Sequence, residues 1–110
     1  MSKVVEIDTE RIVDWESFHD VFQWSLGFPD FYGRNLNAWI DCMTSLDVPA
    51  DRLTTVHVSP GEVLVLRLSS GRELSSRHPD LYAAIVESSA FVNYRRLEVG
   101  ESAVLALAFP

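Results

Sequence analysis

The sequence contains little of what a disulfide-linked, nucleic-acid-binding or membrane protein needs. It has one cysteine, which excludes an internal disulfide framework. Only nine of its 110 residues are Lys or Arg, so it lacks the clustered cations that bind nucleic-acid backbones or anionic membrane surfaces. No stretch approaches the roughly 20 apolar residues of a membrane span, and the N-terminus has no signal-peptide core. We therefore expect a cytoplasmic protein that binds neither nucleic acid nor membrane.

Acidic residues, in contrast, are abundant and unevenly placed. The chain has 16 Asp or Glu residues and a formal net charge of −7. Residues 1–51 carry ten acids and three bases, whereas residues 52–110 carry six of each. This asymmetry predicts a surface for a basic partner in the first half of the chain. The alternative interpretation is an ordinary solvated surface, which has the same composition.

The apolar pattern predicts a single α/β domain over residues 1–110, because 47% of the residues are hydrophobic and can form one core. The expected strands are 4–7, 63–66 and 103–109, and the expected helices are 14–26, 35–46 and 79–94, with a helical turn at 72–77 and an extended segment at 54–58. This alternation predicts a small three-stranded parallel sheet packed with helices. The continuous apolar runs at 63–66 and 103–109 are typical of strands covered on both faces, and the last one predicts a central strand.

Capping and turn residues mark the ends of these elements. Asp14 and Asn35 are expected N-caps, and Gly27 is expected to end the first helix. Pro79 suits the first position of the last helix, which Val99–Gly100 is expected to end. Residues 47–62 predict a long connection that closes with a type II turn at 59–62, where the sequence is Ser-Pro-Gly-Glu.

The predicted helix after Asn35 carries two different faces. At 100° per residue its core face holds Leu36, Trp39, Cys42, Met43 and Leu46. The other face holds Asn37, Ile40, Asp41 and Thr44, with Ile40 expected to be partly exposed. A carboxylate flanked by an aliphatic and two small polar groups is typical of the centre of an interface. An ordinary surface helix is the alternative interpretation.

The loop before this helix contains three aromatics in the sequence Phe-Pro-Asp-Phe-Tyr-Gly at residues 28–33. Aromatic side chains on a loop give a large contact area at low entropic cost, which is common at interfaces. Gly33 can take a positive φ in this turn without penalty. Phe28 or Tyr32 could instead anchor the loop to the core.

Other candidate chemistry is weak. His19, His57 and His78 stand alone, without the spacing of metal ligands, and are expected to be structural. Cys42 lies on the core face, so a buried inert thiol is favoured over a nucleophile. Trp15 and Trp39 are expected in the core, and Trp24 at least partly exposed. We therefore expect no enzyme activity, no metal and no cofactor.

Residues 28–44, with the sequence FPDFYGRNLNAWIDCMT, resemble the signature of the barstar family, whose members are intracellular inhibitors of ribonucleases. The pattern consists of a proline, an acid, two aromatics, a glycine, an Asn-Leu pair and an Asp-Cys pair on the helix. The resemblance implies a barstar-like fold for the whole chain, with residues 47–62 as an insertion relative to the family's namesake. It implies a basic ribonuclease as the partner.

The resemblance also implies how inhibition would work. Asp41 would take the place of the substrate phosphate among the basic catalytic residues of the ribonuclease. Phe31 would stand where the family often has a tyrosine that covers the catalytic histidine, and Gly33 would offer its backbone to the partner. The complete set of expected partner-binding residues is Phe31, Tyr32, Gly33, Asn35, Asn37, Ile40, Asp41, Thr44 and Glu87.

Glu87 enters this set as a second acid from the last helix. The inward stripe of that helix is Leu81, Ala84, Ile85, Ser88 and Val92, and the outward stripe is Ala83, Glu87, Ala90 and Tyr94. The sequence also departs from the namesake. Asn37 stands where an acid is found, Ile40 and Leu46 replace aromatics, and Arg34 adds a positive charge at the contact loop. These differences predict a different target ribonuclease.

The combined hypothesis is an immunity protein, monomeric when free, that occludes the active site of a ribonuclease toxin. The runner-up is a non-inhibitory interaction module of the same fold that binds another basic protein. A small enzyme is a third class, disfavoured because no nucleophile–base pair or metal cluster is visible in the sequence.

Overall fold

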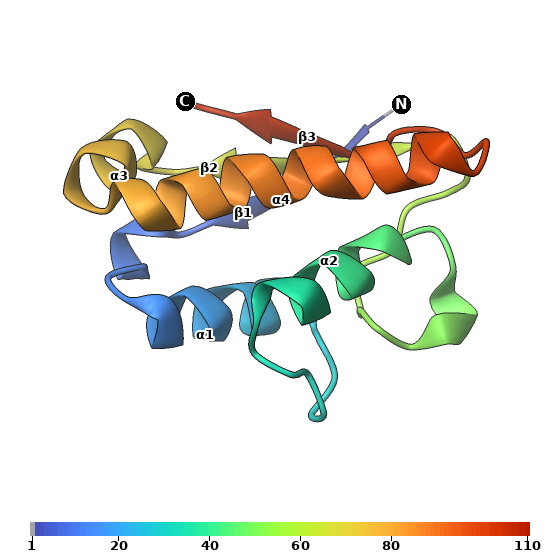
Figure 1. The fold of residues 1–110 in the computed structure, drawn as a ribbon, viewed down its shortest axis with the longest axis horizontal. Coiled ribbons are helices and arrows are strands. Elements are labelled where there is room, and N and C mark those ends of the chain that lie inside the picture. Colours follow the sequence, from blue (N-terminus) through green and yellow to red (C-terminus); the bar gives the residue numbers. More distant parts are fainter. Residues whose placement is uncertain (1) are drawn as a thin grey trace.

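A computed structural model describes residues 2–110 and shows an α/β domain with one three-stranded parallel sheet (Figure 1). The strands are β1 (Ser2–Ile7), β2 (Val63–Leu68) and β3 (Leu105–Ala108), in the spatial order β1-β2-β3. The helices are α1 (Trp15–Leu26), α2 (Leu36–Thr44), α3 (Gly71–Arg77) and α4 (Pro79–Glu98), with short 3-10 turns η1 (Thr9–Arg11) and η2 (Pro49–Asp51). The expected fold class is therefore confirmed.

The sheet buries one face only. Leu64, Leu66 and Leu68 of β2 are fully buried, whereas the alternate residue Arg67 is exposed. On the neighbouring strands, Val4 and Ala106 are exposed on the same side as Arg67. The helices cover the buried face, and α4 runs across the front of the sheet with α1 and α2 beside it (Figure 1). The expectation that β2 is covered on both faces is therefore wrong.

The last strand is also placed differently from expectation. We expected a central strand at residues 103–109, but β3 is an edge strand that pairs only with β2. The outward residues of β3 are Ala106 and Ala108, whose small apolar side chains keep the run apolar without being buried. Residues 54–58 form no strand. Thr55 instead donates a backbone hydrogen bond to the carbonyl of Leu26 at the end of α1, and Val58 donates one to the carbonyl of Leu46, two residues beyond α2.

Local signals place the helix ends correctly. Asp14 caps α1 through a reciprocal capping box with Ser17. Gly27 ends α1 at φ 68°, and a Cβ there would overlap the side chain of Thr55. Gly61 has φ 83° and Glu62 N–H bonds to the carbonyl of Ser59, as a type II turn requires. The helices differ in length from expectation, since α2 ends at Thr44 and α4 continues to Glu98.

The core lies between the sheet and the helices. Its largest fully buried side chains include Trp39, Phe18, Phe22, Ile12, Leu26 and Met43. All five residues of the expected inward stripe of α4 are buried. Trp15, however, is 42% exposed, so its assignment to the core is wrong, and Trp24 is 87% exposed.

Candidate functional site

The loop between α1 and α2 projects from the body of the protein (Figure 1). One of its three aromatic side chains is exposed. Phe31 is 77% exposed. Phe28 and Tyr32 are buried and their rings pack with centroids 4.8 Å apart. Tyr32 also donates its backbone N–H to the carbonyl of Pro29 at 2.9 Å. Tyr32 was expected to contact a partner, but its burial makes it an anchor that holds the loop to the core.

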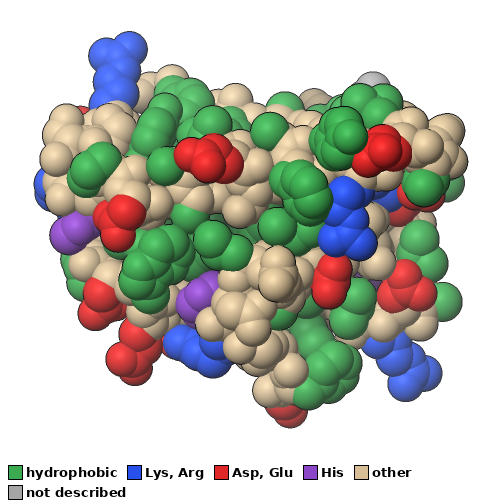
Figure 2. Space-filling model, in the orientation of Figure 1, with side chains coloured by type: hydrophobic (Ala, Val, Ile, Leu, Met, Phe, Trp, Pro, Cys, Tyr) green, Lys and Arg blue, Asp and Glu red, His purple; other side chains and the backbone are tan. Residues whose placement is uncertain are grey.

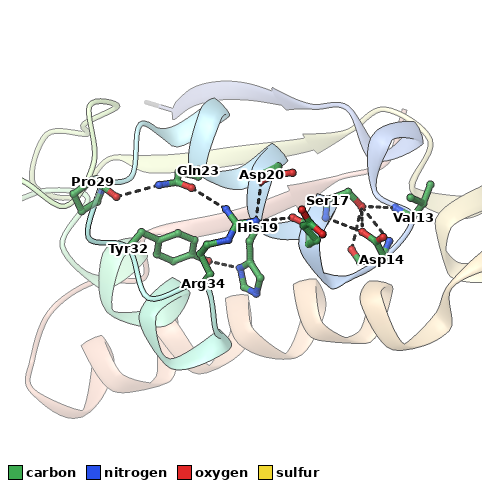
Figure 3. A network of polar contacts seen from close by, with 10 residues as sticks. Val13, Asp14, Ser17, His19, Asp20, Gln23, Pro29, Tyr32 and Arg34 are labelled. Carbon is green, nitrogen blue, oxygen red and sulfur yellow. Dashed lines mark hydrogen bonds and ion pairs between the residues drawn. The ribbon is translucent and has the colours of Figure 1, made fainter.

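A buried hydrogen bond fastens Tyr32 to α1. The Tyr32 hydroxyl lies 2.6 Å from Nδ1 of His19, which is itself buried (Figure 3). Burial lowers the pKa of His19, and the nearby positive charge of Arg34 acts in the same direction while Asp20 opposes it. Burial also raises the pKa of the Tyr32 hydroxyl. Both groups are therefore neutral near neutral pH.

The His19–Tyr32 contact predicts a loss of stability in mild acid. Because the folded-state pKa of His19 lies below its ordinary value of 6.5, the unfolded chain takes up a proton first as the pH falls below about 6.5. Urea unfolding between about pH 7.5 and about pH 5 should show a falling free energy of unfolding. In His19→Gln this fall should be smaller. An identical pH dependence in the variant would contradict the assignment.

Arg34 holds the loop to α1 on the same side. It adopts φ 53°, and its guanidinium bonds to Asp20 Oδ1 at 2.8 Å and to Gln23 Oε1 and the Glu16 carbonyl at 3.0 Å (Figure 3). The residue with positive φ here is Arg34 and not Gly33. One expectation is corrected, because the charge of Arg34 is turned toward α1 instead of toward a partner.

Asn35 is the N-cap of α2, at the point where the loop joins the helix. Its side chain accepts a hydrogen bond from the N–H of Ala38 at 2.8 Å, which confirms the expected cap. Gly33 is exposed but tightly placed, because a Cβ there would lie 3.3 Å from the Cβ of Ala38. The backbone of Gly33 is therefore accessible where a larger residue would press on α2.

The outward face of α2 is narrower than expected. Asn37 and Asp41 are exposed, and Thr44 is half-buried with its hydroxyl donating to the Ile40 carbonyl at 2.6 Å. Ile40 is only 8% exposed and belongs to the core, so the expectation of partial exposure is wrong. Its side of α2 is covered in the tertiary structure, where α4 packs against α2.

Asp41 has a partner within the protein that the sequence did not reveal. Its carboxylate accepts a hydrogen bond from Nη1 of Arg95, on α4, at 3.1 Å. Both side chains are accessible, with 62% of Asp41 and 42% of Arg95 exposed. An exposed pair of this kind contributes about 0–1 kcal/mol, so Asp41 can exchange Arg95 for another cation at little cost.

The outer face of α4 adjoins this pair. Phe91 and Tyr94 are both partly exposed, and their ring centroids lie 6.2 Å apart. Glu87 is exposed on the same helix, about two turns before Arg95. Hydrophobic side chains gather over α4 on this side, with charges of both signs among them (Figure 2). The spacing of Glu87, Phe91 and Arg95 at four residues is the sequence signal that could have found this face.

The next residue, Arg96, is buried and structural. It is 2% exposed and forms a two-pronged pair with Asp47 at 2.8 and 2.9 Å. It also donates to the carbonyls of Thr44 and Ser102 at 2.8 Å. The guanidinium therefore links the end of α2, the start of the 47–62 connection and the segment that leads to β3.

The remaining candidate chemistry is structural, because Cys42 is buried while His57 and His78 are half-buried and stand apart. Cys42 is buried, and this burial raises the pKa of its thiol to about 11, as expected for an unreactive cysteine. Residues 2–110 contain no group of three or more His, Cys, Asp or Glu that could hold a metal ion. Within the same residues, no helix combines the length and apolar character needed to span a membrane.

Comparison with known proteins identifies what this chain is similar to. The family model described as "Barstar (barnase inhibitor)" matches residues 2–90, which include the loop and α2. A protein of Bacillus subtilis (strain 168), named "Putative ribonuclease inhibitor YrdF", is 44% identical over 50 residues. That alignment covers 44% of this chain and 54% of the relative, so the chain spans about half of the relative's length. Since the family model covers most of the chain, this protein belongs to the barstar family.

Proposed function

We propose that this protein inhibits a ribonuclease by covering its active site with the loop 31–33 and the exposed face of α2. The observation that carries the proposal is the position of Asp41, an accessible carboxylate in the middle of a helix whose start is fixed by the Asn35 cap. A ribonuclease active site is cationic because it binds RNA phosphates. A carboxylate held in the place of a phosphate forms charge-assisted hydrogen bonds with such a site.

The surroundings of Asp41 support the same function. Phe31 offers a large accessible aromatic surface at the tip of the loop, and Gly33 exposes backbone beside it. Asn35 and Asn37 are exposed between the loop and Asp41, and the half-buried Thr44 lies about one turn beyond Asp41. Glu87 supplies an acid at the rim, on α4. Tyr32 and Ile40 contribute indirectly, because they fix the loop and the helix from below.

The physiological role that follows is protection of a cell from a ribonuclease toxin. The acids of the first half of the chain would speed encounter with a basic enzyme, and the contact would block RNA without any chemical step. The chain would act as an immunity protein that binds one toxin tightly. Asn37, which is neutral where the family's namesake has an acid, points to a target other than the namesake's.

A capture and cleavage experiment tests the proposal. The purified protein is immobilised, exposed to the ribonuclease toxins of its native host, and each captured enzyme is then assayed on RNA with and without the protein. We expect stoichiometric loss of RNA cleavage and rescue of cells that co-express the toxin. Tight binding of a basic protein that continues to cleave RNA, or that has no ribonuclease activity, would instead favour the non-inhibitory interaction module.

A further inference from the structure

A concave surface lies between β1, η1 and α1 and shares no residue with the proposed inhibitory face. It is a groove of about 1300 Å³. Val21 and Trp24 of α1 line it on one side, and Glu6 and Asp8 line it on the other. The side chains of Ser17, Asp20 and Gln23 also lie along this side of α1, turned away from α4 (Figure 3).

Trp24 is the most exposed large hydrophobic side chain of the described residues, at 87%. It lies on α1, whose core-facing residues Phe18, Phe22 and Leu26 are fully buried, so the fold does not need Trp24 for packing. Tryptophan is among the side chains enriched at the centres of protein interfaces, because it buries a large area and stacks with cations. An accessible tryptophan in a groove is therefore a contact available to a partner.

The strand beside Trp24 has a free edge. β1 pairs with β2 on one side, and no third strand pairs with its other side among residues 2–110. The Ile7 carbonyl accepts a hydrogen bond from Ser69 N–H at 3.1 Å, so Ile7 faces the β2 side. Because alternate residues of a strand direct their N–H and C=O groups to opposite edges, Val4 and Glu6 direct theirs outward. Glu6 itself lines the groove.

The charge of the groove favours one kind of partner. Glu6, Asp8, Glu10 and Asp20 line it, against the single base Arg11. Two of these acids are already matched, since Glu6 pairs with Arg67 and Asp20 with Arg34, both at 2.8 Å. Asp8 meets Arg11 only at 3.7 Å between exposed side chains, and Glu10 bonds to the Ser70 hydroxyl. The uncompensated charge therefore lies at Asp8 and Glu10, just beyond the end of β1.

We propose that this groove binds an extended, positively charged peptide segment of a partner protein, which adds as a strand to the free edge of β1. The backbone of the segment pairs with Val4 and Glu6. One of its Lys or Arg side chains meets Asp8 and Glu10, and another side chain lies on Trp24. A second copy of this chain is a poor occupant of the groove, because each copy carries a net charge of −7.

Titration with two matched peptides tests this proposal by NMR. The probe is an eight-residue peptide of alternating Lys and Val, and its control is the same peptide with Glu in place of Lys. We expect the Lys peptide to shift the backbone amides of Val4 and Glu6 and the indole N–H of Trp24. The Glu peptide should shift none of them. Shifts confined to the Asp41 face, or equal binding of both peptides, would overturn the proposal, as would no shift at millimolar peptide.

Variants test whether peptide binding depends on the acids of the groove or only on the overall negative charge of the protein. Asp8→Asn combined with Glu10→Gln should weaken binding of the Lys peptide about fivefold. The control pair Asp51→Asn and Glu101→Gln, which removes exposed acids that do not line the groove, should leave binding within about twofold. Equal weakening by both pairs would overturn the proposal.

Trp24→Ser keeps the fold because Trp24 is exposed, and it should also weaken binding of the Lys peptide. Sedimentation of the free protein should show no self-association through β1, which would otherwise identify a second copy as the occupant.

Discussion

Replacing Asp41 by asparagine is expected to weaken binding to the target ribonuclease by about 100- to 4,000-fold. In the complex the carboxylate would be buried against the cations of the active site. Removing one partner of a buried ion pair leaves the other charge uncompensated, at a cost of about 3–5 kcal/mol. Calorimetry can measure the loss of affinity. Most of it should appear in the dissociation rate, which surface-binding kinetics can measure.

The free protein should tolerate the same substitution. Asp41 is exposed, and among residues 2–110 its only ion pair is the exposed contact with Arg95, so Asp41→Asn should change the free energy of unfolding by less than about 1 kcal/mol. A matched control is Asp51→Asn, an exposed acid on η2 that should affect only the association rate, and only at low salt. A folded Asp41→Asn variant that inhibits as well as the parent would refute the proposed role of Asp41.

The second large effect is on stability. Arg96→Met should lower the free energy of unfolding by about 3–5 kcal/mol, because it leaves the Asp47 carboxylate without the guanidinium that compensates it. The carbonyls of Thr44 and Ser102 also lose their donor. Urea denaturation at neutral pH measures this loss. The double variant Arg96→Met with Asp47→Asn should recover part of it, since the uncompensated charge is then removed.

Arg95→Met is the matched control for this prediction. Arg95 is the preceding residue of the same helix and also pairs with an aspartate, but that pair is exposed and its loss should cost less than about 1 kcal/mol. The two variants would have similar effects if side-chain burial were unimportant.

The pH dependence of stability provides a further check on the Arg96–Asp47 pair. The hydrogen bond from Arg96 lowers the pKa of Asp47 below its ordinary 3.8, so the pair stabilises the fold fully above that pH. Its contribution is lost as the pH falls lower, and the difference between parent and variant should then shrink.

Those parts of the fold that depend only on residues adjacent in the chain could be predicted from the sequence. The Asp14 and Asn35 caps, the end of α1 at Gly27 and the turn at 59–62 each depend on a few adjacent residues, and all are confirmed. The order of the strands was not predictable in this way. β3 looks central because its outward alanines are apolar, although Ala106 is exposed and Ala108 is only half-buried.

The candidate site also combines features that the local sequence predicts with features that only the tertiary packing determines. The exposure of Phe31 and Asp41 and the burial of Cys42 follow from helical periodicity and from the loop composition. The burial of Ile40 depends on where α4 packs, which the pattern of α2 alone does not contain. Arg95 and Arg96 are identical neighbours in the sequence, yet one is exposed beside Asp41 and the other is buried against Asp47. Only the packing of α4 on α2 distinguishes them.

Because Tyr32 and Arg34 hold the loop to α1, the structure also bears on the rate at which a partner would bind. With Tyr32 bonded to His19 and Arg34 bonded to three groups of α1, the loop has its shape before any partner arrives. In the proposed complex no slow ordering step would stand between collision and capture, so diffusion and charge would set the association rate. An inhibitor that must intercept a nuclease before it cuts RNA benefits from such a loop more than from additional contacts.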